Sequence, residues 1–277
     1  MVFYSSLPLG REMGILKSSS KHLLLLPLLI NLLTSSSEAA PTYSTHVCTK
    51  GSYYPPNTTF QTNLNLLLSS LVSNSSLHDG FYLTTIHDVK GLFLCRGDAI
   101  PSFCHDCVAA AAKNITHLCT NQTESVIWYD QCMVRYSNLS FLNNTFPGVT
   151  LINQQSVPDS DINPFNELLA ATLNDVRQAA VKNYQYHHNL LFATKEANLT
   201  SSSMYSLYTL AQCTLDLSTS ECEMCLSTAI SVFPSCCGGK RGARSLLPSC
   251  NIRYELYPFY NVSTHPVPDL PPPPSNS

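Results

Sequence analysis

The spacing of apolar residues in the first half of the chain predicts two helices and four strands. Apolar residues from Phe60 to Leu71 recur at helical spacing, so a helix begins in the N-cap region 57–59 and ends within 73–76. A second helix follows Ser102, whose hydroxyl can cap it. Short runs rich in aromatic and β-branched residues predict strands at 81–87, 91–96, 125–129 and 133–138.

The second half repeats this order of elements. Apolar residues from Phe165 to Val176 predict its first helix, and Ser220 with Glu223 forms the capping-box pattern that opens its second helix. Residues from about 143 to 160 are expected to link the two halves. Helices and strands do not alternate strictly, so each half is an α+β module with an antiparallel sheet. The predicted strands of the second half are 189–195, 204–213, 243–247 and 251–257.

The cysteines repeat in the same way as the apolar pattern. A cysteine, eight other residues and a Cys-x-x-Cys occur twice, starting at Cys95 and at Cys213. A constant offset of 118 carries five cysteines of the first copy onto five of the second. Cysteines in register over this length indicate a tandem repeat. The matched cysteines are Cys95, Cys104, Cys107, Cys119 and Cys132 with Cys213, Cys222, Cys225, Cys237 and Cys250.

The first 39 residues resemble a secretory signal. Lys17 and Lys21 precede an apolar run, 23–33, that is shorter than the roughly 20 residues needed to span a membrane. Small residues before Ala40 suit a cleavage site; a buried core helix is the alternative. We therefore expect a signal peptide at 1–39, a first domain at 40–145, a second domain at 146–262 and a Pro-rich tail at 263–277.

The chain has few charged residues and a slightly negative net charge, which limits the classes of partner that it is expected to bind. Of 277 residues, 12% are charged; removing residues 1–39 leaves 12 basic and 16 acidic residues. No basic run remains that could neutralise phosphates, so nucleic acid is not an expected partner. No second apolar segment approaches membrane length, so we expect a secreted, soluble product without a membrane span.

All twelve cysteines follow the expected signal, six in each copy, which is typical of disulfides in a secreted protein. Zinc sites built on the Cys-x-x-Cys pairs with His105 or His117 are the alternative. These histidines have no counterpart in the second copy, so we expect neither a metal nor a cofactor. Glycosylation sequons also favour the secretory route and lie at Asn57, Asn74, Asn114, Asn121, Asn138, Asn143, Asn198 and Asn261.

The cysteine frame, together with the segments 127–137 and 236–255, resembles the plant cysteine-rich repeat secretory proteins. These proteins carry two ginkbilobin-homologous (salt-stress/antifungal) domains. The same pair of domains forms the ectodomains of cysteine-rich receptor-like kinases and of plasmodesmata-located proteins. The resemblance spans roughly residues 43–260 and implies two disulfide-stapled α+β domains, each a five-stranded antiparallel sheet packed with two helices.

The resemblance also implies a disulfide pairing. Cys237 matches Cys119, but the second copy has no cysteine that matches Cys48, and Cys236 is present instead. A vicinal Cys236–Cys237 bond and pairing with another chain both remain open. The implied pairs are Cys48–Cys119, Cys95–Cys104, Cys107–Cys132, Cys213–Cys222 and Cys225–Cys250.

The family's mannose site, which uses an Asn, an Arg and a Glu, implies a sugar-binding site in the second domain. Arg244 and Glu255 match the Arg and the Glu, and Asn153 and Gln155 are the candidates for the Asn position. A guanidinium and a carboxylate can together bind neighbouring sugar hydroxyls. A turn at 248–250 would place the two side chains nearly opposite each other, and a cross-strand surface ion pair is the alternative interpretation. The first copy has Thr49, Val126 and Ser137 at these positions, so no site is expected there.

No catalytic constellation is present in the sequence. A cysteine nucleophile needs a free, activated thiolate, and nearly every cysteine here has an expected partner. We therefore expect a binding protein of the apoplast and not an enzyme. One hypothesis is a lectin-like, antifungal defence protein that binds mannose or cell-wall glycan through its second domain. The other is an interaction module without sugar binding, whose partners are receptors or other extracellular proteins.

Overall fold

The structure is a computed structural model that describes residues 40–49, 53–139, 141, 147–186, 190–200 and 204–261. The expected signal peptide, the sequon at Asn143 and the Pro-rich tail lie outside the described residues. A search of the described helices finds none that is both long enough and apolar enough to cross a membrane.

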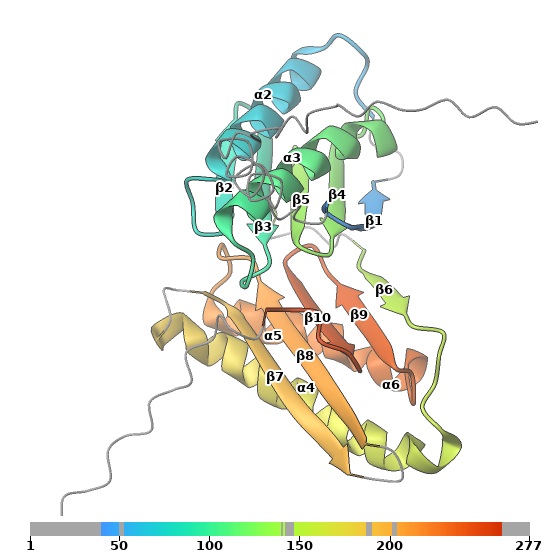
Figure 1. The fold of residues 1–277 in the computed structure, drawn as a ribbon. Helices are drawn as coiled ribbons and strands as arrows, with labels where there is room; N and C mark the ends of the chain where they lie inside the picture. The colour runs from blue at the N-terminus through green and yellow to red at the C-terminus, as the bar shows by residue number, and fades with distance from the viewer. Residues whose placement is uncertain are drawn as a thin grey trace, which may run out of the picture. The chain divides into compact units, whose positions relative to one another are not determined.

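The first domain is a five-stranded antiparallel sheet with the strand order β1-β4-β5-β3-β2. Two helices pack on one face of this sheet, where their apolar residues and those of the strands form one core (Figure 1). The elements are β1 (Tyr43–Cys48), α2 (Thr59–Asn74), β2 (Phe81–Ile86), β3 (Val89–Cys95), α3 (Pro101–Leu118), β4 (Glu124–Tyr129) and β5 (Cys132–Ser137).

The second domain repeats this topology, with the strand order β6-β9-β10-β8-β7. The helices again pack on one face, around a core of their own. The expected α+β fold with two five-stranded sheets is therefore confirmed. The elements are β6 (Val149–Ile152), η2 (Asp159–Asp161), α4 (Ile162–Tyr186), β7 (Phe192–Thr200), β8 (Met204–Cys213), α5 (Thr219–Ser231), the short α6 (Phe233–Cys236), β9 (Gly242–Leu246) and β10 (Cys250–Glu255).

The central strands of the first sheet are buried on both faces. Successive side chains of a strand point to opposite faces, yet all six residues of β4 and all six of β5 are buried. One face meets α2 and α3. On the other face, Trp128 and Met133 belong to an apolar cluster that includes Leu246, Val149 and Leu151 of the second domain. The face of the first sheet that carries no helices is therefore covered by the second domain.

Two local expectations, on the link between the domains and on the cap of α3, are wrong. The stretch 143–160 is not merely a link, because Val149–Ile152 forms β6, an edge strand of the second sheet. Helix α3 has Ile100 at its N-cap position, with Pro101 as its first residue, so Ser102 is not the cap. Proline suits this position because its missing N–H group has no partner in the first turn.

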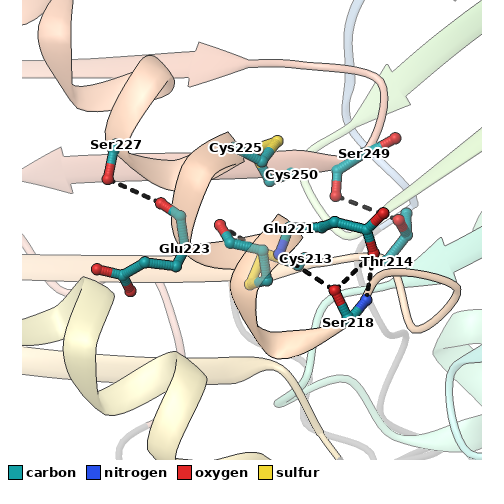
Figure 2. Close-up of a disulfide and its surroundings, with 10 residues drawn as sticks. Cys213, Thr214, Ser218, Glu221, Glu223, Cys225, Ser227, Ser249 and Cys250 are labelled. Carbon is teal, nitrogen blue, oxygen red and sulfur yellow. Dashed lines mark hydrogen bonds between the residues drawn. A yellow bond between two sulfur atoms is a disulfide. The ribbon is translucent and has the colours of Figure 1, made fainter. Parts of the chain in front are cut away.

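The capping box of α5 lies two residues earlier than the sequence pattern placed it. The Ser218 hydroxyl accepts a hydrogen bond from the backbone N–H of Glu221, and the Glu221 carboxylate accepts one from the backbone N–H of Ser218 (2.8 Å; Figure 2). Glu223 instead forms an ion pair with Arg177 of α4. Both boxes have the same Ser-x-x-Glu spacing, so the sequence pattern alone does not separate them.

The structure contains all five disulfides that the resemblance implies. In each domain, one bond joins the end of a strand to the start of the following helix, and another joins that helix to the last strand of the domain. Figure 2 shows the second kind, Cys225–Cys250. A sixth bond joins the neighbours Cys236 and Cys237. That bond closes almost no loop, so it restricts the unfolded chain much less than the other five do.

Candidate functional site

The three candidate sugar-binding residues lie on neighbouring strands of the second sheet, around Gly242. Arg244 is on β9 and Glu255 is on β10, directly opposite Gly242. The backbone N–H of Asn153, just after β6, donates to the Gly242 carbonyl (2.8 Å). Residues opposite each other or two apart share a face, so the register brings Arg244 and Glu255 onto one face, as diagonal neighbours. The two are offset diagonally and not directly opposite, because Arg244 itself faces Arg253.

The absence of a side chain at Gly242 makes room for Glu255. A Cβ atom built on Gly242 would overlap the Glu255 carboxylate. The carboxylate accepts a hydrogen bond from Nε of Arg253 (3.0 Å), two residues earlier on the same strand, and forms an ion pair with its NH2 group (2.9 Å). Burial raises the pKa of Glu255 above its ordinary value, although Arg253 and Arg244 act in the opposite direction. Glu255 is therefore buried and paired with Arg253, and it is not half of an exposed ion pair.

Arg244 is engaged by the first domain. Its NH1 group donates to the Ser44 hydroxyl (2.9 Å) and forms an ion pair with Asp130, which Arg253 also approaches at 3.6 Å. Burial alone would raise the pKa of Asp130, but the two arginines and Ser44 hold it below its ordinary value. The Arg244 side chain is 12% exposed. The alternative interpretation, a cross-strand surface ion pair between Arg244 and Glu255, is thus wrong. The carboxylate that pairs with Arg244 is that of Asp130, in the other domain.

Little space is left beside this cluster. The cavity that Arg244, Asp130 and Trp128 line has a volume of about 30 Å³. Such a volume has room for about two water molecules. In this arrangement of the domains, a monosaccharide ring cannot reach Arg244 without separating Arg244 from Asp130.

Other contacts hold the two domains together around the cluster. The side-chain amide of Gln212 donates to the Cys95 carbonyl (2.9 Å), and the backbone N–H of Asn261 donates to the Asp98 carboxylate (2.7 Å). A Cβ atom on Gly97 would overlap the ring of Phe192, so backbone of the first domain lies directly against an aromatic side chain of the second. The domain contact therefore combines an apolar cluster with charged groups that pair across it.

The first domain has an arginine equivalent to Arg253, but the carboxylate that pairs with it comes from the neighbouring strand and not from the same strand. Arg135, which the offset of 118 carries onto Arg253, bonds to Glu124 at 3.2 Å. Glu124 lies opposite Ser137, just as Gly242 lies opposite Glu255. A phenylalanine stacks on each arginine: Phe141 on Arg135 and Phe259 on Arg253, both at 4.2 Å.

Sequence reasoning missed the residues that engage Arg244. Ser44 lies on β1, a strand that the apolar pattern did not reveal, and Asp130 lies in the β4–β5 turn. The offset of 118 carries Asp130 onto Pro248, so the repeat comparison gave no signal for it. Arg253 could have been singled out from the repeat, because the offset of 118 carries Arg135 onto it.

Exchanging the two carboxylate arrangements is a test of this equivalence. Gly242→Glu should destabilise the protein by about 2 kcal/mol or more, because it places a second buried carboxylate against Glu255. Adding Glu255→Ser recreates the order found in the first domain, and we expect it to recover more than half of that loss. Urea unfolding of the two single variants and the double variant measures the coupling. Additive losses would show that the two arrangements are not equivalent.

Comparisons with known proteins agree with this architecture. The salt stress response/antifungal family matches residues 47–139 and 153–257. The antimicrobial ginkbilobin-2-like protein of Castanea crenata is 39% identical over 251 residues, which cover 88% of this chain and 99% of that protein. Cysteine-rich receptor-like protein kinase 25 of Arabidopsis thaliana is 42% identical over 244 residues, covering 85% of this chain. These residues span 35% of the kinase, about a third of its length.

Solved structures show the same pair of domains. The tandem DUF26 ectodomain of the Arabidopsis thaliana cysteine-rich receptor-like protein PDLP8 matches with a TM-score of 0.65 and 25% identity, over 77% of this chain and 98% of that chain. The corresponding ectodomain of PDLP5 matches with a TM-score of 0.58 and 27% identity, over 78% of this chain and 99% of that chain. The chain therefore belongs to the salt stress response/antifungal family and carries two copies of its domain.

Proposed function

We propose that the chain is a secreted, defence-related recognition module that binds another extracellular protein with the surface of its two joined domains. The observation that carries the proposal is the engagement of Arg244 by Asp130, which leaves the candidate sugar residues occupied by contacts within the protein. Solved ectodomains of receptor-like proteins and an antimicrobial relative support an extracellular, defence-related role. The family assignment does not point to a catalytic group among these residues.

Exposed aromatic side chains of the first domain suit such a partner. Strand β1 is an edge strand, and Tyr43 at its start is 45% exposed. Tyr53 is 65% exposed. It forms a β-bridge with Gln122, which lies three residues after Cys119 of the disulfide that joins β1 to the end of α3. Leu118, next to that disulfide, is 44% exposed. Exposed tyrosines are favoured anchors of protein interfaces.

The sequons fit the same setting, and we include their glycosylation in the proposal. Among those that the structure describes, Asn57, Asn138, Asn198 and Asn261 are exposed, which leaves their side chains accessible to a glycan. Treatment with a glycosidase that removes N-linked glycans should lower the apparent mass of the secreted protein on a gel.

A panel of purified ectodomains from cysteine-rich receptor-like kinases is the direct test of the proposed partner class. We expect binding to at least one ectodomain. The Tyr43→Ala, Tyr53→Ala double variant should weaken it about tenfold or more, because truncated anchors cost about 2 kcal/mol or more. Met224→Ala, which removes another exposed apolar side chain from α5, is the matched control. Biolayer interferometry supplies the affinities, and a glycan array is probed in parallel. Binding to glycans alone, with no ectodomain bound, would contradict the proposal.

Glycan binding by the second domain is the second candidate function. Its support is the placement of Asn153, Arg244 and Glu255 around the side-chain gap at Gly242. A sugar that uses these residues must compete with Asp130 for the guanidinium of Arg244. Binding would therefore need a separation of the domains at this point or a change at Asp130.

Mannose titration of an Asp130 variant separates the two candidates. If Arg244 binds sugar, Asp130→Ala should strengthen mannose binding, because it frees the guanidinium. Arg244→Ala should abolish binding and Arg244→Lys should largely fail, since one ammonium cannot replace the guanidinium fork. Arg177→Ala, which removes an arginine of α4, is the control. Calorimetry up to about 50 mM mannose detects even a Kd near 1 mM, about 4 kcal/mol. A flat titration of Asp130→Ala would end the lectin hypothesis.

A further inference from the structure

A second cavity lies in the second domain, between α4 and the junction of α5 with α6, among helices and not beside the charged cluster. Its volume is about 230 Å³. Asn166, Leu169 and Leu173 line it from α4, and Phe233 and Cys237 line it from the other side. Positions three, four and seven apart on a helix share one face, so the α4 residues present a continuous wall.

The cavity lies where the helix that follows β8 is interrupted. In the first domain α3 runs unbroken to Leu118, whereas in the second domain α5 ends at Ser231 and α6 begins at Phe233. Pro234 lies in the first turn of α6, where its missing N–H group and its ring prevent continuation of α5.

The walls of the cavity are apolar, and one end is polar. Leu169, Leu173 and Phe233 are each at most 5% exposed, and none of the described residues that line the cavity is charged. An apolar cavity of about 150 Å³ in another protein stays dry and binds benzene. This cavity is therefore large enough for one ring with a short substituent, and its walls would exclude an ion or a sugar.

The polar end is the side-chain amide of Asn166. Its Oδ1 atom accepts a hydrogen bond from the backbone N–H of Gly239 (2.8 Å), which fixes the orientation of the amide. Among the described residues, no hydrogen-bond partner is found for the Nδ2 group, which remains a donor beside the cavity. A ligand that fills the apolar space and also carries an acceptor oxygen would satisfy this donor.

We propose that this cavity binds a small aromatic alcohol or phenol. The ring lies between the α4 leucines and Phe233, in contact with the sulfur of Cys237, and the oxygen accepts a hydrogen bond from Nδ2 of Asn166. Sulfur atoms make favourable contacts with aromatic rings, so the Cys236–Cys237 disulfide contributes a wall of matching chemistry. The proposal does not depend on sugar or protein binding by the rest of the molecule.

The test compares benzyl alcohol with toluene, which has the same ring and lacks the oxygen. We expect the oxidised full-length chain to bind benzyl alcohol in an NMR titration, with toluene several-fold weaker. Ala170→Trp fills the cavity from an exposed position of α4 and should weaken benzyl alcohol about tenfold or more. Ala171→Trp, at the next exposed alanine, which does not line the cavity, is the control and should leave binding unchanged.

A second variant tests the role of the amide without filling the cavity. Asn166→Asp keeps an oxygen that accepts from Gly239 and replaces the Nδ2 donor by an acceptor. It should remove the preference for benzyl alcohol over toluene, and thermal unfolding checks that the variant folds. An absence of binding to the unchanged chain would overturn the proposal. Equal effects of Trp at 170 and at 171, or a preference that survives in Asn166→Asp, would do so as well.

Discussion

The ion pair between Asp130 and Arg244 is the interaction on which the arrangement of the two domains depends most. Burying a charge is unfavourable unless an opposite charge and hydrogen bonds accompany it. The second domain places Arg244 and Arg253 directly opposite each other on one face, and Glu255 offers its carboxylate to Arg253. Arg244 therefore needs a partner from elsewhere, and Asp130 and Ser44 of the first domain supply it.

The same face of each sheet takes part in the contact between the domains. Leu94 and Trp128 of the first sheet correspond, by the offset of 118, to Gln212 and Leu246 of the second, and all four line the small cavity beside Arg244. A sheet with helices on one face must cover its other face or leave it in water. Duplication gave each domain a partner for that face, which explains why β4 and β5 are buried on both sides. A residue set that could contact sugar on an isolated domain then becomes part of a contact within the chain.

Much of the fold could be predicted from the sequence because it depends on local periodicity and on repeated cysteines. Helix α2 was located by apolar spacing alone, since its buried residues recur at the helical period. The edge strands β1 and β6 were missed because their residues are only partly buried and give no clear alternation. The capping box was misplaced because two Ser-x-x-Glu patterns overlap within six residues of the chain.

The candidate site could be predicted only in part, for a different reason. The match to Arg244 and Glu255 placed both on one face, which the register of β9 and β10 bears out. The partner of Arg244 lies 114 residues away in the other copy, and no counterpart in the repeat points to it. A contact between domains depends on how two folded surfaces meet, and the spacing of residues within one copy does not encode that arrangement. The same applies to the cavity beside α4, which residues far apart in the sequence line together.

A double-mutant cycle on Asp130 and Arg244 tests the central claim most directly, because the two residues belong to different domains. Urea unfolding of Asp130→Ala, Arg244→Ala and the double variant gives their coupling energy, with the more exposed pair Arg177 and Glu223 as the control. We expect a coupling of about 1–3 kcal/mol for the interdomain pair and below about 1 kcal/mol for the control. A coupling of zero between Asp130 and Arg244 would contradict the account, because it would mean that this contact does not hold the domains together.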